Sequence, residues 1–113
     1  MTQGTFQGVR VIELGHFLLV PAATAILADW GADVIKIESP KGGDPLRHPV
    51  PSPDLTRLPT DFSIWFEQCN RNKSSVALDV TKERGREVLH KLVKKADVFV
   101  TNVEPSLRRE NKG

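Results

Sequence analysis

The sequence predicts an α/β fold in which helices flank a parallel β-sheet. Short apolar stretches rich in β-branched residues alternate with helical stretches along the chain. Residues 9–38 have the length of one strand–helix–strand unit, and residues 75–102 form a second unit of the same kind. Because such a crossover joins parallel strands and is right-handed, the two units predict a three-layer architecture around one sheet.

The first unit contains two strands and an Ala-rich helix. Residues 9–14 alternate apolar and polar side chains and then become apolar, which is typical of a strand entering a core. A helix follows from Pro21, a residue suited to the first helical turn, and stops at Gly31. Residues 33–38 predict the second strand.

A proline-rich segment separates the two units. Residues 39–60 hold six of the eight prolines, so we expect a loop without regular elements. Loops of this length are more often functional than merely connecting. Residues 61–68 predict a short helix capped by Thr60 or Asp61.

The second unit contains an amphipathic helix. We expect a strand at residues 75–79, a helix capped by Thr81, and a strand at residues 97–102. The apolar face of this helix comprises Val88, Leu89, Leu92 and Val93. Residues 104–113 are polar and predict no core element.

Length and composition limit the class of protein. The 113 residues predict a single α/β domain over residues 1–113, itself part of a larger fold, with residues 39–60 as a loop within it. Hydrophobic residues at 39% and charged residues at 27% exclude a disordered or low-complexity chain. We find no membrane-spanning run and no secretory signal. The single cysteine, Cys69, excludes an internal disulfide and favours a cytoplasmic setting.

The net charge of +2 is too small to predict nucleic-acid binding, but the charge is unevenly distributed. Residues 1–70 are acidic overall, whereas residues 71–113 are basic. Two interpretations remain open: a solvated helix face with a basic end, or a basic half that faces an anionic ligand.

The predicted topology places four segments at one edge of the sheet. The carboxyl ends of the strands lie at residues 14–19, 38–44, 79–82 and 101–109, and ligands of such sheets bind outside these ends. The sequence holds neither a Gly-x-Gly-x-x-Gly motif nor a P-loop, and no spacing typical of metal ligands. Gly42 and Gly43 predict either a plain turn or backbone amides that hold an oxygen anion.

Five segments carry a resemblance to a known family. They are Leu14-x-x-Phe17 with Pro21, residues 27–38, Gly43-Asp44-Pro-x-Arg47, residues 70–79, and residues 85–102 with Asp97 and Asn102. In this order they resemble the N-terminal portion of the family III CoA-transferases, which include formyl-CoA transferase, carnitine CoA-transferase and α-methylacyl-CoA racemase. The resemblance covers about residues 8–105.

The resemblance implies a Rossmann-like CoA-binding domain, an interlocked homodimer, and a reaction in which a catalytic aspartate attacks an acyl-CoA and passes CoA to a second carboxylic acid. That aspartate lies beyond the matched segments, so we assign no catalytic residue here. The resemblance also implies CoA contacts at nine positions. These are Phe17, Leu18, Ser39, Leu78, Thr81, Asn102, Val103, Arg108 and Arg109. The cations expected to meet the CoA phosphates are Arg71, Lys73, Lys82, Arg108 and Arg109.

The sequence departs from the family pattern at three of these places. Relatives often have Ala-Gly-Pro where this chain has Leu19-Val20-Pro21, and Val20 crowds the approach to a thioester. Ser39 lacks a positive charge, and Val103 replaces an aromatic residue. Three functions therefore stay open: the CoA-binding part of a transferase, a stand-alone CoA- or nucleotide-binding or self-associating module, and a remnant that folds only with a partner chain.

Overall fold

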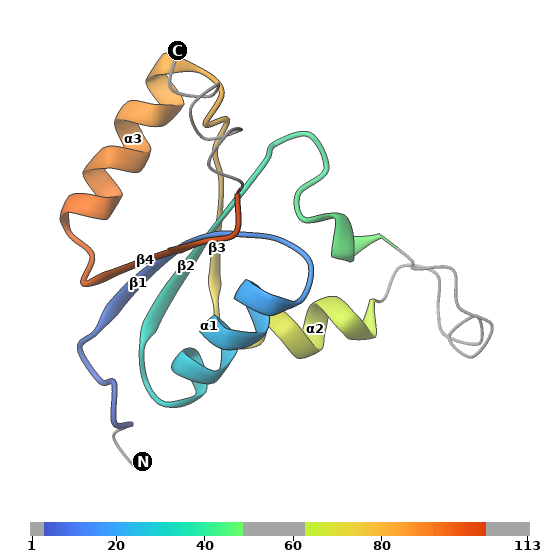
Figure 1. Ribbon diagram of the computed structural model, residues 1–113, viewed down its shortest axis with the longest axis vertical. Helices are drawn as coiled ribbons and strands as arrows, with labels where there is room; N and C mark the ends of the chain where they lie inside the picture. Colours follow the sequence, from blue (N-terminus) through green and yellow to red (C-terminus); the bar gives the residue numbers. More distant parts are fainter. Residues whose placement is uncertain (1–3, 49–62, 104–113) are drawn as a thin grey trace.

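The computed structural model describes residues 4–48 and 63–103. Its strands are β1 (Arg10–Leu14), β2 (Asp33–Glu38), β3 (Ser74–Ala77) and β4 (Val98–Thr101), and they form one sheet in the order β3-β2-β1-β4. Every strand pair is parallel. The predicted α/β fold with a parallel, Rossmann-like sheet is therefore confirmed (Figure 1).

Helices cover both faces of this sheet. The helix α1 (Leu19–Asp29) packs on one face beside α2 (Ile64–Asn70), and α3 (Glu83–Lys94) packs on the other (Figure 1). Successive strand residues point to opposite faces, which gives each helix its own apolar cluster. On the α1 side the buried residues of the cluster are Val11, Ala28, Ala32 and Val34, and on the α3 side they are Ile12, Ile37 and Leu89.

The strand order reverses between β1 and β4. From β1 the chain moves outward to β2 and then β3, whereas β4 returns to the free side of β1. In open parallel sheets this switch point leaves a crevice at the carboxyl ends of the strands. The sheet therefore provides the geometry that a ligand site requires at the edge marked by Leu14 and Thr101.

The described part of the proline-rich segment, residues 39–48, contains a short 3-10 helix, whereas the proline count predicted no regular element. A 3-10 helix, η1, spans Pro45–Arg47, and the Asp44 side chain caps it by accepting a hydrogen bond from Leu46 N at 2.9 Å. Pro45 stands at the start of the turn, where a missing N–H is harmless. Residues 49–60 of the predicted loop lie outside the described residues.

Two predicted helix starts are wrong, because in each helix another residue takes the cap position. The helix α2 begins at Ile64 with Ser63 as its cap, whose hydroxyl accepts from Phe66 N at 3.2 Å. Thr81 does not cap α3, because its hydroxyl donates to Asp79 and Lys82 occupies the cap position.

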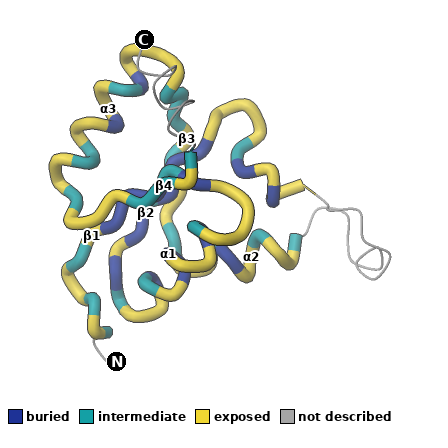
Figure 2. Tube along the Cα trace, viewed as in Figure 1, coloured by how far each residue is buried: buried dark blue, intermediate teal, exposed yellow. Residues whose placement is uncertain are grey.

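The amphipathic face of α3 is confirmed in part. Leu89 is buried, and Leu92 and Val93 pack against the same cluster, but Val88 is 43% exposed. Figure 2 shows buried, intermediate and exposed positions following one another along α3. Gly85 lets α3 approach the loop after β3, because a Cβ at this position would lie 1.8 Å from the Asp79 carbonyl oxygen. No helix within residues 4–48 and 63–103 is long and apolar enough to cross a membrane.

Candidate functional site

The carboxyl ends of the strands meet around a pocket of about 180 Å³. Its walls come from residues 14–16 after β1, residues 37–39 and 43–45 after β2, residues 78–81 after β3, and Val103 after β4. The prediction that four separated segments converge on one edge of the sheet is confirmed. The pocket thus lies where doubly wound sheets bind their ligands.

Eight of the nine sequence-based candidates fall into three groups. Ser39, Leu78, Thr81 and Val103 line it. Phe17 and Leu18 lie in the adjoining β1–α1 loop and are 50% and 44% exposed. Arg108 and Arg109 lie outside the described residues.

Asn102 contacts the protein rather than standing free in the pocket. Its Oδ1 accepts from His16 N at 3.3 Å, and its Nδ2 donates to His16 O at 2.9 Å. This pair of bonds ties the end of β4 to the loop after β1 across the switch point. The amide of Asn102 therefore fixes the position of His16, which itself lines the pocket.

Gly15 and Val20 lie against each other beside Asn102. A Cβ built on Gly15 would be 2.7 Å from Val20 Cγ1 and 3.3 Å from Asn102 Oδ1. The side chain of Val20 thus lies directly against Gly15 at the end of β1. That Val20 crowds the approach to a thioester stays a prediction.

Glu38 anchors the loop after β2. Its Oε1 accepts from Asp44 N at 2.9 Å and Arg47 Nε at 2.7 Å, and its Oε2 accepts from Arg47 Nη2 at 2.7 Å and from the Ser75 hydroxyl. Burial opposes ionisation, but these hydrogen bonds outweigh it and lower the pKa of Glu38 to about 2. The amide that follows Gly42 and Gly43 is that of Asp44, and it donates to the Glu38 carboxylate. The anion held at this turn therefore belongs to the protein itself.

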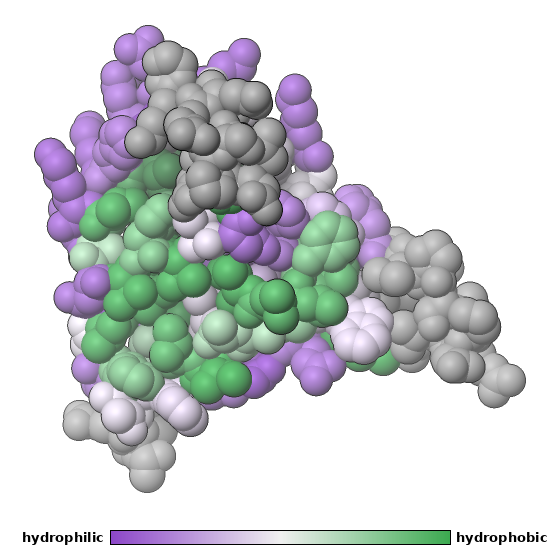
Figure 3. Space-filling model, in the orientation of Figure 1, coloured by the Kyte–Doolittle hydropathy of each residue, from purple (hydrophilic) through white to green (hydrophobic). Residues whose placement is uncertain are grey.

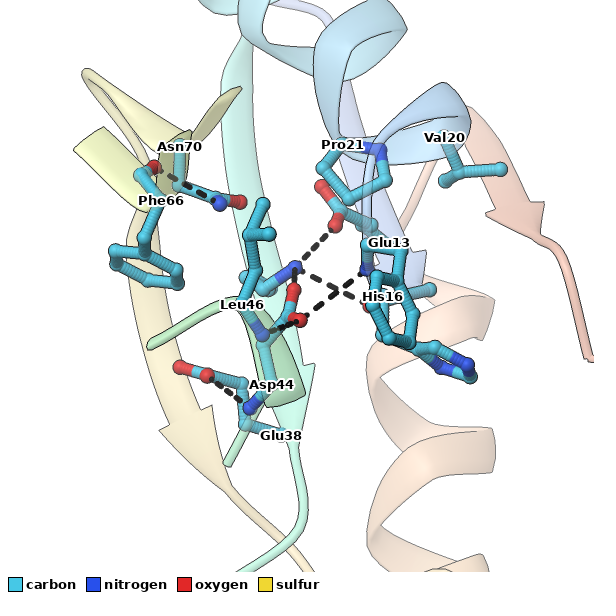
Figure 4. A network of polar contacts seen from close by, with 12 residues as sticks. Glu13, His16, Val20, Pro21, Glu38, Asp44, Leu46, Phe66 and Asn70 are labelled. Atoms are coloured by element: carbon cyan, nitrogen blue, oxygen red, sulfur yellow. Dashed lines mark hydrogen bonds and ion pairs between the residues drawn. The ribbon is translucent and has the colours of Figure 1, made fainter. Parts of the chain in front are cut away.

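A network of buried charges lies between the sheet and α1 (Figure 4). Lys36 Nζ lies 2.7 Å from Glu13 Oε2 and 2.9 Å from Asp44 Oδ2, and Lys73 Nζ lies 2.7 Å from Glu13 Oε1. The Thr24 hydroxyl also donates to Glu13. The side chains of all four charged residues are at most 2% exposed. Opposite charges lie next to one another, as burial requires.

The sequence analysis missed this network. One feature of the sequence could have indicated it: Glu13 and Lys36 are charged residues inside two apolar strands. They are paired in the register of β1 and β2. Opposite charges at paired positions inside two apolar strands indicate a buried ion pair.

Two expected phosphate-binding cations are unsuited to that role. Lys73 Nζ is buried and bonded to Glu13, Pro21 O and Asn70 Oδ1, and burial lowers its pKa. Arg71 precedes β3, so it lies at the amino edge of the sheet, where its Nη2 pairs with Asp29 Oδ2 at 2.7 Å. Lys82 is exposed, and so is Lys41, which the sequence patterns did not indicate. Both charges help to lower the pKa of Asp79, which lines the pocket.

The carboxylates that line the described part of the pocket are all engaged. Glu38 accepts four hydrogen bonds, and Asp44 is 3% exposed. Asp79 accepts from Thr81 N at 3.0 Å and from the Thr81 hydroxyl, which lowers its pKa. Glu38 and Asp44 therefore lack the unpaired, accessible oxygen expected of a nucleophile. Both hydrogen bonds to Asp79 reach its Oδ1. Within the described residues, no group of three or more His, Cys, Asp or Glu side chains is arranged to hold a metal ion.

Comparison with known proteins shows which family the chain is related to. Residues 6–111 match the CoA-transferase family III. This chain belongs to that family. It is 43% identical over 97 residues to the cinnamoyl-CoA:phenyllactate CoA-transferase of Clostridium sporogenes, covering 86% of this chain and 23% of that protein. It is 38% identical over 105 residues to the formyl-CoA:oxalate CoA-transferase of Streptomyces coelicolor, covering 93% and 24%.

Solved structures of two other proteins share the fold. The chain superposes on a CAIB/BAIF family protein from Brucella suis with a TM-score of 0.81 and 34% identity, covering 97% of this chain and 29% of that one. It superposes on Rv3272 from Mycobacterium tuberculosis in its orthorhombic form with a TM-score of 0.83 and 30% identity, covering 96% and 29%. The chain thus spans about a quarter of the length of the relatives it matches.

Proposed function

We propose that this chain is the N-terminal CoA-binding segment of a family III CoA-transferase and that its ligand is CoA or an acyl-CoA. One observation carries the proposal: a pocket forms where the strands end, and four residues that the family resemblance assigns to CoA contacts line it. They are Ser39, Leu78, Thr81 and Val103. The single-domain assignment over residues 1–113 and the cytoplasmic setting stay predictions.

The charges around the pocket suggest which part of CoA it holds and where the CoA phosphates bind. Among the described residues that line the pocket there is no lysine or arginine, and the nearby Lys36 and Arg47 already pair with Asp44 and Glu38. The pocket therefore suits an uncharged part of CoA. We assign the phosphates to the exposed Lys41 and Lys82, together with Arg108 and Arg109.

Calorimetric titration with CoA at two salt concentrations tests this proposal. We expect binding that weakens as salt rises, because solvent-exposed charges are screened within about 10 Å at 0.1 M salt. The double variant Lys41→Met, Lys82→Met should bind about fivefold more weakly. The matched control Arg10→Met removes a charge at the opposite edge and should leave the affinity unchanged. If no heat of binding were measured at millimolar CoA, the proposed CoA binding would be wrong.

We propose further that the 113 residues alone bind CoA without transferring it. The engaged state of Glu38 and Asp44 supports this, since both carboxylates are buried and paired within the protein and offer no free oxygen for attack on a thioester. An assay of CoA transfer from formyl-CoA to oxalate should give no product above the buffer rate. Sustained product formation by the purified chain would contradict this and require another nucleophile.

A self-associating module is the second candidate, and the outer surface of α1 favours it. Leu19 and Ile26 on α1 are 86% and 44% exposed, and Trp30, which follows the helix, is 53% exposed. Val98 and Phe99 on the edge strand β4 are 40% and 41% exposed. Figure 3 shows hydrophobic residues gathered across the face that carries α1. Surfaces of this kind mark interaction sites, and an edge strand offers unpaired backbone groups.

We therefore expect the chain to form homo-oligomers, in which segments can be exchanged between copies. Sedimentation velocity over a hundredfold range of concentration should show dimers or larger species that increase with concentration. The variant Leu19→Glu, Ile26→Lys should shift the population toward monomer, whereas Glu87→Lys on the exposed side of α3 should not. A clean monomer at the highest concentration would contradict this expectation.

A further inference from the structure

The β1–α1 loop forms one wall of the pocket, and Asp44 holds it from a distant segment. Asp44 Oδ1 accepts a hydrogen bond from Phe17 N at 3.2 Å and another from Leu46 N at 2.9 Å. One buried carboxylate oxygen thus joins the loop after β1 to the turn η1 after β2 (Figure 4). Asp44 and His16, from these two segments, both line the pocket.

The Phe17 backbone needs such a contact. Its φ is +66°, in the left-handed region that a bulky side chain seldom adopts. A strained residue of this kind persists only where the surroundings hold it in place. His16, its neighbour, is bonded through both backbone groups to Asn102. Two successive loop residues are therefore fixed by side chains from two other segments.

Asp44 is itself held from several sides. Its backbone N donates to Glu38 Oε1 at 2.9 Å, and its Oδ2 lies 2.9 Å from Lys36 Nζ. Lys36 in turn donates to Glu13 Oε2 at 2.7 Å and to Gly15 O at 3.1 Å, so it contacts the start of the same loop. The carboxylate is thus a fixed point between β1 and β2.

Asp44 makes these bonds without facing solvent. The residue is 3% exposed and its side chain is fully buried. Both carboxylate oxygens are directed at groups of the protein, so the carboxylate affects a ligand through the loop that it holds.

We propose that Asp44 is a positioning residue for ligand binding, because its carboxylate holds the Phe17 amide and so fixes the β1–α1 loop, whose residues Gly15 and His16 line the pocket. This inference rests on the proposed function, since the ligand is taken to be CoA. Preorganising a loop in its bound conformation improves affinity by removing the entropy cost of ordering it.

Two variants of Asp44 and one control test this. Asp44→Ala removes the acceptor, whereas Asp44→Asn keeps an oxygen that can accept from Phe17 N. Asp97→Ala is the matched control, because Asp97 Oδ2 likewise accepts from a backbone N, that of Arg10 at 2.9 Å, but at the amino edge of the sheet. Each protein is titrated with CoA below its unfolding transition, and hydrogen exchange of the Phe17 amide is followed by NMR.

We expect Asp44→Ala to bind CoA about tenfold more weakly and to lose exchange protection at Phe17. Asp44→Asn should keep much of both properties, and Asp97→Ala should match the unmodified chain in both. If Asp44→Ala does not fold, Asp44→Asn provides the test. A small loss of CoA affinity together with slightly faster Phe17 exchange supports the inference, and no change in either contradicts it.

The two proposals fail in different ways. If the unmodified chain binds CoA and the folded Asp44 variants bind equally well, Asp44 is only structural and the inference is wrong. If Phe17 exchange does not change in Asp44→Ala, the inference is wrong whether or not CoA binds. If no protein binds CoA, the proposed function fails, and a loss of Phe17 protection would then support the loop-holding role alone.

Discussion

Replacing Glu13 with Gln is expected to destabilise the fold by about 3–5 kcal/mol. Glu13 is fully buried and is the carboxylate shared by Lys36 and Lys73, whose side chains are 1% and 2% exposed. Removing one partner of a buried ion pair leaves an uncompensated charge away from water, which is far more costly than losing a surface pair. Urea denaturation at pH 7 measures the loss.

Asp33→Asn provides the control for Glu13. The pair that Asp33 makes with Arg10 has side chains that are 54% and 45% exposed, so its loss should cost less than about 1 kcal/mol. If Glu13→Gln destabilised the chain no more than Asp33→Asn, the charges would not be buried as described.

The second large effect is a loss of stability in acid that depends on Glu38. The pKa of Glu38 is lowered from 4.5 to about 2 in the folded state. Below about pH 4.5 the unfolded chain takes up a proton at this residue and the folded chain does not, so stability falls as the pH drops toward 2. The shift corresponds to about 2–3 kcal/mol lost over this range.

Arg47→Met should reduce this acid dependence, because Arg47 donates two of the hydrogen bonds that stabilise the Glu38 carboxylate. The variant should be less stable at pH 7 and should lose less stability between pH 5 and pH 2. Arg10→Met, which removes a half-exposed pair, should keep the slope of the unmodified chain. Equal slopes in Arg47→Met and the unmodified chain would show that Glu38 is not the group responsible.

The elements that local patterns define were predicted well. The strand β2 runs from Asp33 to Glu38, as the apolar pattern indicated, and β1 differs by one residue. The convergence of the strand ends followed from topology, because two right-handed crossovers leave all carboxyl ends on one edge. Helix starts were predicted less well, since Ser63 and Thr81 each had several competing hydrogen-bonding partners along the chain.

The contacts that shape the site could not be predicted from local patterns. Lys73 reaches Glu13 across 60 residues, and Asn102 reaches His16 across 86. Such pairings depend on side-chain positions that only the assembled sheet fixes. For this reason Lys73 was assigned to a phosphate, although the fold uses it to neutralise a buried carboxylate. Likewise, the resemblance assigned Asn102 to ligand contact, although its amide is bonded to the backbone of His16.

The most direct test of the account is an NMR titration of the isotopically labelled chain with CoA, which locates any binding on the fold. We predict that chemical-shift changes concentrate at His16, Ser39, Thr81 and Val103, around the pocket at the carboxyl edge. Residues at the amino edge, such as Arg10, Asp33 and Asp97, should not change. Changes centred on the amino edge, or an absence of changes at saturating CoA, would contradict the claim that this pocket is the CoA site.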